Sequence, residues 1–305
     1  MQESVAGLAI KPDGVYVDGT FGRGGHSRAI LEQLGENGRL IGIDADPILL
    51  TTDVQNELQD VFSDARFQFC HDNFVNLKNL LIKCGLLGRI DGVLLDLGVS
   101  SPQLDDASRG FSFLRNGPLD MRMDTTTGID AATWLAQVSE KELVRVLRTY
   151  GEEPAAKRIA KAVMRQRDIE AITTTRQLSD LIAGVGTRTA PGKHAATRSF
   201  QAIRIAVNDE LRVLEDVLPQ CVEALAPGGR LSIISFHSLE DRIVKQFMTR
   251  ESAGVTDWLP GMRVPEHNQP QTVRKIGKAI RASAEEQRDN PRSRSACLRI
   301  VEKLQ

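Results

Sequence analysis

The sequence predicts an α/β fold built on one parallel sheet, with a helical segment inserted into it. Short apolar runs recur with connections of helix length between them, which is typical of strands buried on both faces of a parallel sheet. From about residue 106 to residue 200 the apolar residues recur at helical spacing instead, and strand patterning then returns. We therefore expect a discontinuous sheet domain, residues 1–105 and 201–305, interrupted by a helical domain for substrate recognition over residues 106–200.

The first half of the predicted sheet comes from four apolar runs in the first hundred residues. The first run ends in a glycine-rich loop, after which residues 26–34 have the pattern of a helix that stops at Gly35. Each of the other runs ends within two residues of an aspartate, namely Asp44, Asp72 and Asp96. The predicted strands are Val15–Asp18, Leu40–Ile43, Arg66–Cys70 and Gly92–Leu97.

Three helices are expected in the insertion. Ser139 and Glu142 have the spacing of a capping box, and so do Thr174 and Gln177. Between these two helices, residues 156–163 place small and apolar side chains on one helix face. On the opposite face lie Lys157, Arg158, Lys161 and Arg165. That basic stripe is either a solvated helix face or a surface that contacts RNA phosphates.

The sheet pattern resumes after the insertion. A long helix is expected over residues 200–226, stopped by Pro227 and two glycines, and a strand over residues 230–236. Residues 254–294 are rich in proline and charge and are expected to form a mobile loop. Residues 295–301 are expected to form a last, antiparallel strand at the edge of the sheet.

Composition excludes several classes of protein. With 41% hydrophobic and 26% charged residues, the chain resembles an ordinary soluble globular protein, and no apolar run approaches the roughly 20 residues that span a bilayer. The amino terminus lacks the features of an export peptide, so we expect a cytoplasmic protein with no membrane partner. Its four cysteines are too widely spaced for a metal or redox pair, so we expect buried, reduced thiols and no metal site.

Charge is distributed unevenly along the chain. Residues 1–106 contain 8 lysines and arginines against 16 acidic residues, whereas residues 145–212 contain 13 against 7 and residues 263–299 contain 9 against 4. Two basic blocks thus follow an acidic front half. A polyanionic partner such as nucleic acid would explain this asymmetry, and so would an ordinary charged surface.

The glycine loop and Asp44 indicate a nucleoside-containing cofactor. Glycines let a backbone approach a ligand closely, and a carboxylate at the end of the second strand can accept hydrogen bonds from both ribose hydroxyls. A dinucleotide-binding loop would need a third glycine at the position of Ser27, which is absent. The loop therefore favours S-adenosylmethionine, which has no pyrophosphate, over a nicotinamide cofactor.

Asp96 closes the fourth strand, where a side chain of such a sheet lies beside the reactive sulfonium. It could contact the donor, hold the nucleophile, or cap Ser100 or Ser101. The residues that follow it do not form the Asp/Asn-Pro-Pro-Tyr run of many amino-methyltransferases that act on bases. If the substrate is the amine of a base, a different group of side chains must therefore surround that amine.

Six long blocks make the sequence similar to a known family. It resembles the bacterial 16S ribosomal RNA cytosine-N4 methyltransferases, known as MraW or RsmH, over nearly its whole length. The family usually has a further amino-terminal segment containing His-x-Pro-Val-Leu-Leu, from which this chain departs by beginning at Met1. The matching blocks span residues 17–27, 94–105, 109–113, 117–124, 196–204 and 232–242.

The resemblance implies a Rossmann-like, S-adenosylmethionine-dependent methyltransferase sheet with an inserted helical domain. Its expected reaction is methylation of the exocyclic N4 amine of one cytosine in the decoding region of 16S ribosomal RNA, within a small-subunit particle; the oligomeric state stays open. Carried over from the family, the donor-binding residues are Gly24, Gly25, His26, Asp44, Phe74, Asp96 and Gln103.

For catalysis, the expected residues are Asp96 and His237. Asp96 is the first candidate to accept a hydrogen bond from the amine, and Ser100 and Ser101 are alternatives. His237 follows a predicted strand, where it could contact the base, relay a proton or serve packing alone. RNA is expected to bind Lys157, Lys161 and Arg165. The remaining alternatives are a nicotinamide-dependent oxidoreductase and a non-catalytic RNA-binding factor that retains a donor pocket.

Overall fold

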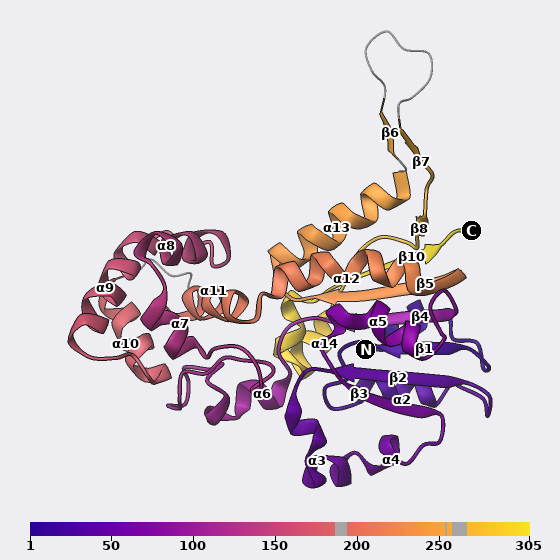
Figure 1. Ribbon diagram of the computed structural model, residues 1–305, viewed down its shortest axis with the longest axis horizontal. Helices are drawn as coiled ribbons and strands as arrows, with labels where there is room; N and C mark the ends of the chain where they lie inside the picture. The colour runs from indigo at the N-terminus through magenta and orange to yellow at the C-terminus, as the bar shows by residue number, and fades with distance from the viewer. Residues whose placement is uncertain (187–193, 254, 258–266) are drawn as a thin grey trace. The chain divides into compact units, whose positions relative to one another are not determined.

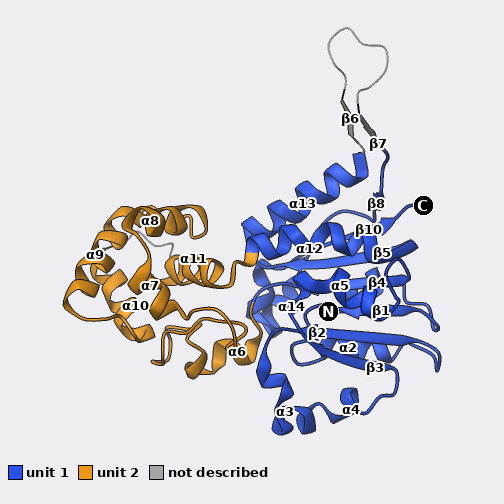
Figure 2. Ribbon diagram, viewed as in Figure 1, with its two compact units in different colours: residues 1–98, 211–305 blue, residues 99–210 orange. Residues whose placement is uncertain are grey.

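The computed structural model describes residues 1–186, 194–253, 255–257 and 267–305. They form two compact units (Figure 2), one made of residues 1–98 and 211–305 and the other of residues 99–210. The second unit thus begins seven residues earlier and ends ten residues later than the helical insertion expected at 106–200.

The first unit is built on a sheet of eight strands. Its order is β3-β2-β1-β4-β5-β10-β8, with β9 also paired to β10. Strands β1 to β5 are mutually parallel along this order, and β10 runs antiparallel to β5. The strands are β1 Val15–Asp18, β2 Arg39–Asp44, β3 Phe67–His71, β4 Ile90–Asp96, β5 Leu225–Ser235, β8 Val273–Lys275, β9 Ile280–Arg281 and β10 Cys297–Lys303.

Helices cover both faces of this sheet (Figure 1). Because side chains alternate along a strand, Tyr16 and Val17 enter two different cores. Val17 packs with residues of α5 (Leu77–Lys83), α12 (Glu210–Ala224) and α13 (Ser238–Ala253). Tyr16 packs with residues of α1 (Gln2–Gly7), α2 (Gly25–Leu31), α3 (Thr52–Glu57) and α4 (Gln59–Phe62). The parallel sheet buried on both faces is therefore confirmed.

Shorter elements complete the first unit. Three 3-10 helices are η1 (Pro47–Leu50), η2 (Phe74–Asn76) and η4 (Pro291–Ser295), and α14 spans Ala284–Asp289. Strands β6 (Val255–Asp257) and β7 (His267–Gln269) pair antiparallel in a separate two-stranded sheet.

The second unit is helical and has its own core. Buried apolar residues from α7, α8, α9, α10 and α11 pack together in it. Ser139 and Thr174 cap α8 and α10 as expected, although only Thr174 forms the reciprocal capping box with Gln177. Its elements are α6 Ser101–Asp105, η3 Ala107–Arg109, α7 Ala131–Gln137, α8 Glu140–Thr149, α9 Ala156–Ile169, α10 Thr175–Gly184 and α11 Thr197–Asn208.

Three expectations about the carboxyl-terminal half are wrong. The long helix is two helices, α11 and α12, because Asp209 adopts a left-handed φ of 51° between them. β10 is antiparallel but is not the edge strand, since β8 and β9 pair with its outer side. These two strands, with α14 and η4, lie in the segment expected to be a loop; its residues 254 and 258–266 lie outside the described part.

Two expectations drawn from composition also have outcomes in the structure. Among the cysteines, Cys221 and Cys297 are buried and Cys70 is half-buried, whereas Cys84 is exposed, so the expected burial is wrong for Cys84. Within the described ranges, no helix combines the length and apolar character needed to cross a bilayer.

Candidate active site

The glycine loop lies at the carboxyl end of β1, close against the sheet. Gly22 and Gly24 adopt positive φ angles of 52° and 70°, which side chains disfavour. At Gly19, a Cβ atom would lie 2.5 Å from Cδ2 of Leu95 on the neighbouring strand β4. A side chain at this position would therefore displace Leu95, so glycine favours the close approach of the loop to β4.

Asp18, the last residue of β1, holds the loop in place, and the sequence analysis did not single it out. Its side chain is fully buried. One carboxylate oxygen accepts a 2.7 Å hydrogen bond from the hydroxyl of Ser27, and the other accepts one from the backbone N–H of Thr20. Burial raises the pKa of Asp18 to about 6. An acidic residue directly before a glycine loop was the sequence feature that could have identified it.

Asp44 ends β2 beside the same loop. Its carboxylate accepts hydrogen bonds from the backbone N–H groups of Gly22, at 2.7 Å, and Asp46, at 2.9 Å. Burial raises its pKa above the ordinary value. Two carboxylate oxygens have about four acceptor positions, so these two bonds leave capacity for ribose hydroxyls. Phe74 follows β3 at the start of η2 and is partly buried.

Asp96 occupies the end of β4, between the loop and β5. Its backbone N–H donates a 2.7 Å hydrogen bond to the hydroxyl of Thr20 in the loop. Its Oδ1 atom is buried and has no hydrogen-bond partner in the described structure. Burial raises its pKa to about 7, and the nearby charge of Asp18 adds to the effect. A buried acceptor without a donor is costly, so Oδ1 is suited to a ligand that brings a donor.

His26 lies beside Asp96 as a neutral base. Its Nδ1 is 3.8 Å from Oδ2 of Asp96, and its Nε2 is 3.0 Å from the hydroxyl of Ser4. Because Ser4 donates its own proton to the carbonyl of Met1, it accepts from Nε2–H of His26. Nδ1 therefore has a lone pair facing Asp96. Burial lowers the pKa of His26 to about 4, so that the ring is uncharged at neutral pH.

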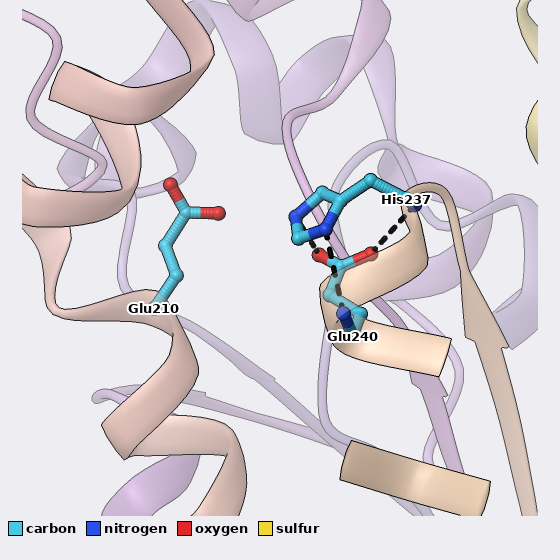
Figure 3. Close-up of side chains that lie close together, drawn as sticks. All are labelled: Glu210, His237 and Glu240. Carbon is cyan, nitrogen blue, oxygen red and sulfur yellow. Dashed lines mark hydrogen bonds and ion pairs between the residues drawn. The ribbon is translucent and has the colours of Figure 1, made fainter. Parts of the chain in front are cut away.

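His237 lies at the corner between β5 and α13, where Glu240 holds it (Figure 3). One oxygen of Glu240 accepts hydrogen bonds from the backbone N–H groups of Phe236, at 2.8 Å, and His237, at 3.2 Å. The other lies 3.1 Å from Nε2 of His237, outside hydrogen-bond geometry. The structure thus fixes the ring through Glu240, which the sequence analysis missed despite its position three residues after His237.

This corner is next to Asp96 in the sheet. Asp96 is paired with Ile234 of β5, and the N–H of Leu97 donates to the carbonyl of Ile234 at 3.0 Å. The charge of Glu240 also contributes to the raised pKa of Asp96. The first unit therefore brings Gly24, Gly25, His26, Asp44, Phe74, Asp96 and His237 to the carboxyl edge of its parallel strands.

The remaining predicted site residues lie in the second unit. Gln103 is largely buried on α6, where its side-chain oxygen accepts the backbone N–H of Ser100 in a capping box. Lys157, Lys161 and Arg165 are exposed on α9. They have no ion-pair partner among the described residues.

Two aromatic residues of the block 109–113 pack within the second unit itself. Phe111 is buried in the core of this unit. Phe113 is stacked on the ring of His194 with centroids 4.6 Å apart, and it meets Phe200 edge-on. Both rings therefore have packing partners within the second unit.

Hydrogen bonds within the second unit hold the loop over residues 117–124. Asn208 accepts from the backbone N–H of Met123 and donates to the carbonyl of Met121, at 2.7 Å each. The guanidinium of Arg109 donates to the carbonyls of Arg122 and Met123. Arg109 and Asn208 therefore position this loop.

The fold is an α/β fold whose candidate site lies at the carboxyl edge of a parallel sheet, the edge at which such sheets generally bind ligands. The model of the MraW methylase family matches residues 1–304. The chain therefore belongs to the MraW methylase family. It is a methyltransferase whose cofactor is S-adenosylmethionine.

Three solved structures align with nearly the whole of this chain. A protein from Clostridium thermocellum assigned as an rRNA methylase has 12% identity and a TM-score of 0.45, with 99% of this chain and 96% of that chain covered. An rRNA methylase from Streptococcus thermophilus has 10% identity and a TM-score of 0.42, with 99% and 93% covered. A protein from Streptococcus mutans, assigned as a methyltransferase and solved with SAH, has 11% identity and a TM-score of 0.45, with 99% and 97% covered.

The residues of the first unit fit the cofactor. The loop packs closely at Gly24, where a Cβ would lie 3.2 Å from the ring of Phe21, and it becomes exposed at Gly25. Asp44 has spare acceptor positions beside this loop, as a ribose requires. The orphaned Oδ1 of Asp96 offers an acceptor at the end of the neighbouring strand.

Proposed function

We propose that this chain transfers a methyl group from S-adenosylmethionine to the exocyclic N4 amine of a specific cytosine in the decoding region of 16S ribosomal RNA. The enzyme would act in the cytoplasm on RNA within a small-subunit particle. The observation that carries the proposal is the buried, unpartnered Oδ1 of Asp96 at the carboxyl edge of the sheet. The base and its position in the RNA come from the family resemblance.

Chemistry at this amine requires an acceptor for one of its protons. The N4 lone pair of cytosine is delocalised into the ring, so the amine is a weak nucleophile while it stays planar. S-adenosylmethionine, when bound, supplies an electrophilic methyl group on a positively charged sulfur. Asp96, by accepting a hydrogen bond from the amine, would favour a tetrahedral nitrogen and align it for in-line attack.

The proton lost by the amine has an acceptor within the first unit. Asp96 has a pKa of about 7, so it can accept a proton near neutral pH. His26 has an Nδ1 lone pair 3.8 Å from Oδ2 of Asp96. A small movement would let a protonated Asp96 donate to that lone pair. We therefore assign His26 a positioning role for Asp96 in addition to its place at the donor site.

His237 and Gln103 have more limited proposed roles. His237 is fixed by Glu240 next to the end of β4, where its ring could contact the cytosine. Gln103 stabilises the amino end of α6 through Ser100, and we propose that it supports the loop at the methionine end of the donor. Ser100 is the capping partner of Gln103, which makes it less suitable as the acceptor for the amine.

The exposed basic stripe of α9 is the proposed RNA-docking surface of the second unit. Lys157, Lys161 and Arg165 have no anionic partner within the described ranges. Arg158, by contrast, donates to the carbonyls of Val185 and Gly186 at the end of α10. Three cations on one helix face can therefore bind phosphates without first losing an ion pair.

Transfer of a labelled methyl group to RNA tests this function. The protein is incubated with methyl-labelled S-adenosylmethionine and either 16S or 23S ribosomal RNA, as free RNA and as small- or large-subunit particles. We expect label in 16S RNA only. Donor binding with no transfer to any RNA would identify a non-catalytic binding factor, and transfer to 23S RNA would contradict the proposed substrate.

A further inference from the structure

A basic pocket lies in the first unit along the outer part of the sheet. It has a volume of about 90 Å³ and lies between α13, β8, the turn after β8, and β10. Among the described residues, four cationic and no acidic ones line it: Lys245, Lys275, Lys278 and Arg299. The remaining lining is apolar or small, apart from the hydroxyl of Thr249.

The positive charge of this pocket is not neutralised by its surroundings. Of these four cations, Arg299 alone has an ion-pair partner among the described residues, Asp241, through two hydrogen bonds of 2.7 and 3.1 Å. Lys275 donates to the uncharged hydroxyl of Thr249 at 2.9 Å. Lys245 and Lys278 are exposed and have no anionic partner in the described part of the chain.

Two nearby carboxylates, those of Glu302 and Glu251, form ion pairs with arginines. Glu302, on β10, accepts from Arg274 at 2.6 Å and from Arg230 at 3.1 Å. Glu251, at the end of α13, pairs with Arg250 at 3.2 Å. The three lysines thus form a net positive group next to satisfied ion pairs.

The pairing of β8 and β9 with β10 shows that basic residues extend from the pocket to the carboxyl edge of the sheet. Lys275 is opposite Val301 of β10, whereas Arg281 of β9 is opposite Cys297. Cys297 is in turn opposite Ser235, the last residue of β5. Lys275, Lys278 and Arg281 therefore follow the outer side of β10 and end level with the strand end that precedes His237.

We propose that Lys245, Lys275 and Lys278 bind backbone phosphates of the RNA substrate, on nucleotides flanking the target base. This inference rests on the proposed function, which supplies the RNA. An ammonium group is a compact point charge that binds phosphate without fixed geometry. The basic residues along β10 (Lys275, Lys278 and Arg281) extend to the sheet edge that carries Asp96 and His237. An RNA strand whose base enters the site would therefore pass along these residues. They add a second phosphate-binding surface to the stripe on α9.

The test compares two triple variants of equal charge change. In the first, Lys245, Lys275 and Lys278 are each replaced by glutamine. In the control, glutamine replaces Arg39, Lys83 and Arg89, which are exposed near the amino ends of β2 and β4. Binding of a 16S RNA fragment containing the decoding region is measured from 50 to 300 mM salt. Calorimetric titration with S-adenosylmethionine checks that both variants retain a folded donor site.

Loss of three phosphate contacts should reduce the slope of log affinity against log salt by about 2, since each contact with a single strand contributes about 0.7. Affinity at the lowest salt should fall on the order of 10-fold or more. The control should match the wild type. Equal behaviour of the two variants would overturn the pocket assignment while leaving the function intact. If the wild-type protein itself fails to bind or methylate this RNA, the proposed function is wrong.

Discussion

The position of Asp96 at the end of β4 raises its pKa into the neutral range. Thr20 fixes its backbone, the neighbouring Asp18 adds negative charge, and burial of Oδ1 disfavours ionisation. The resulting pKa of about 7 differs from that of an exposed aspartate by roughly three units. Its position at a strand end was predictable from the sequence. Its pKa was not, because it depends first on burial and then on the charges of Asp18 and Glu240, all of which arise only through the fold.

Replacing Asp96 by asparagine should slow the chemical step. Asparagine keeps the shape of the side chain but replaces one acceptor oxygen with a donor. We expect the single-turnover rate at saturating donor to fall on the order of 10²-fold, the scale for one lost transition-state contact. Affinity for S-adenosylmethionine should fall less. A normal saturated rate with a collapse of donor affinity would instead assign Asp96 to the donor alone.

The pH dependence of that rate should follow the ionisation of Asp96. Only the carboxylate accepts the amine hydrogen bond, so the rate of the wild-type enzyme should rise with pH and level off above about 7. Single-turnover rates from pH 5.5 to 8.5 measure this. A rate that is flat across this range would contradict the assignment.

Stability should depend on the same group. Because the folded-state pKa is raised, the folded protein binds this proton more tightly than the unfolded chain. The contribution of Asp96 to the free energy of unfolding is thus greatest below its ordinary pKa near 3.8, and this contribution is lost as the pH rises to about 7. Relative to wild type, Asp96→Asn should be more stable at pH 8 by about 1 to 3 kcal/mol, and the difference should shrink toward pH 4. Denaturant unfolding at several pH values provides the comparison.

Asp44 should contribute to donor affinity and not to folding. Replacing it by alanine removes a charged acceptor for the ribose hydroxyls, so S-adenosylmethionine binding should weaken by roughly 1 to 3 kcal/mol. Calorimetric titration measures this loss, with Asp53→Ala, on the exposed surface of α3, as the control. Unchanged affinity in a folded Asp44→Ala protein would remove this residue from the donor site.

At the scale of elements, the sequence predicted those whose pattern is local. The strands β1 to β4 and the buried face of α9 follow from apolar periodicity, and Thr174 with Gln177 from capping chemistry. The break at Asp209 carries no glycine or proline. It is stabilised by contacts that sequence spacing does not show, such as the two 2.8 Å hydrogen bonds from Arg204 to Glu210.

The strands β8 and β9 were missed for a related reason. They contain only three and two residues, and most of these are charged. Their strand conformation comes from pairing with β10 and not from their own apolar pattern. Short edge strands with basic side chains resemble a loop in sequence, which explains why β10 was expected at the edge.

The basic stripe on α9 leads to a prediction at the same scale. Replacing Lys157, Lys161 and Arg165 by glutamine should weaken RNA binding and reduce its salt dependence, because each lost phosphate contact removes a released counterion. Donor affinity should stay unchanged. Salt titrations of RNA binding measure both effects.

A charge-matched control within the second unit separates this stripe from net charge. Lys141, Arg148 and Arg176 are exposed on α8 and α10 and are replaced by glutamine in the control. Its RNA affinity should stay close to wild type. An equal loss in both variants would show that α9 is only a solvated face.

For the whole molecule, the two-unit organisation has a simple physical basis. Each unit buries its own apolar core, one on both faces of the sheet and one among helices α7 to α11. The switch from strand to helical periodicity made the insertion visible in the sequence. The observed unit, residues 99–210, is longer than the expected insertion, residues 106–200, because the loop before α6 and the end of α11 pack with the helical unit.

Identification of the methylated nucleoside is the most direct test of the central claim. Small-subunit RNA lacking this modification is incubated with the protein and S-adenosylmethionine, digested to nucleosides and analysed by mass spectrometry. The account predicts N4-methylated cytidine, located in a fragment from the decoding region. A methyl group on another base, on a ribose, or at C5 of cytosine would contradict it.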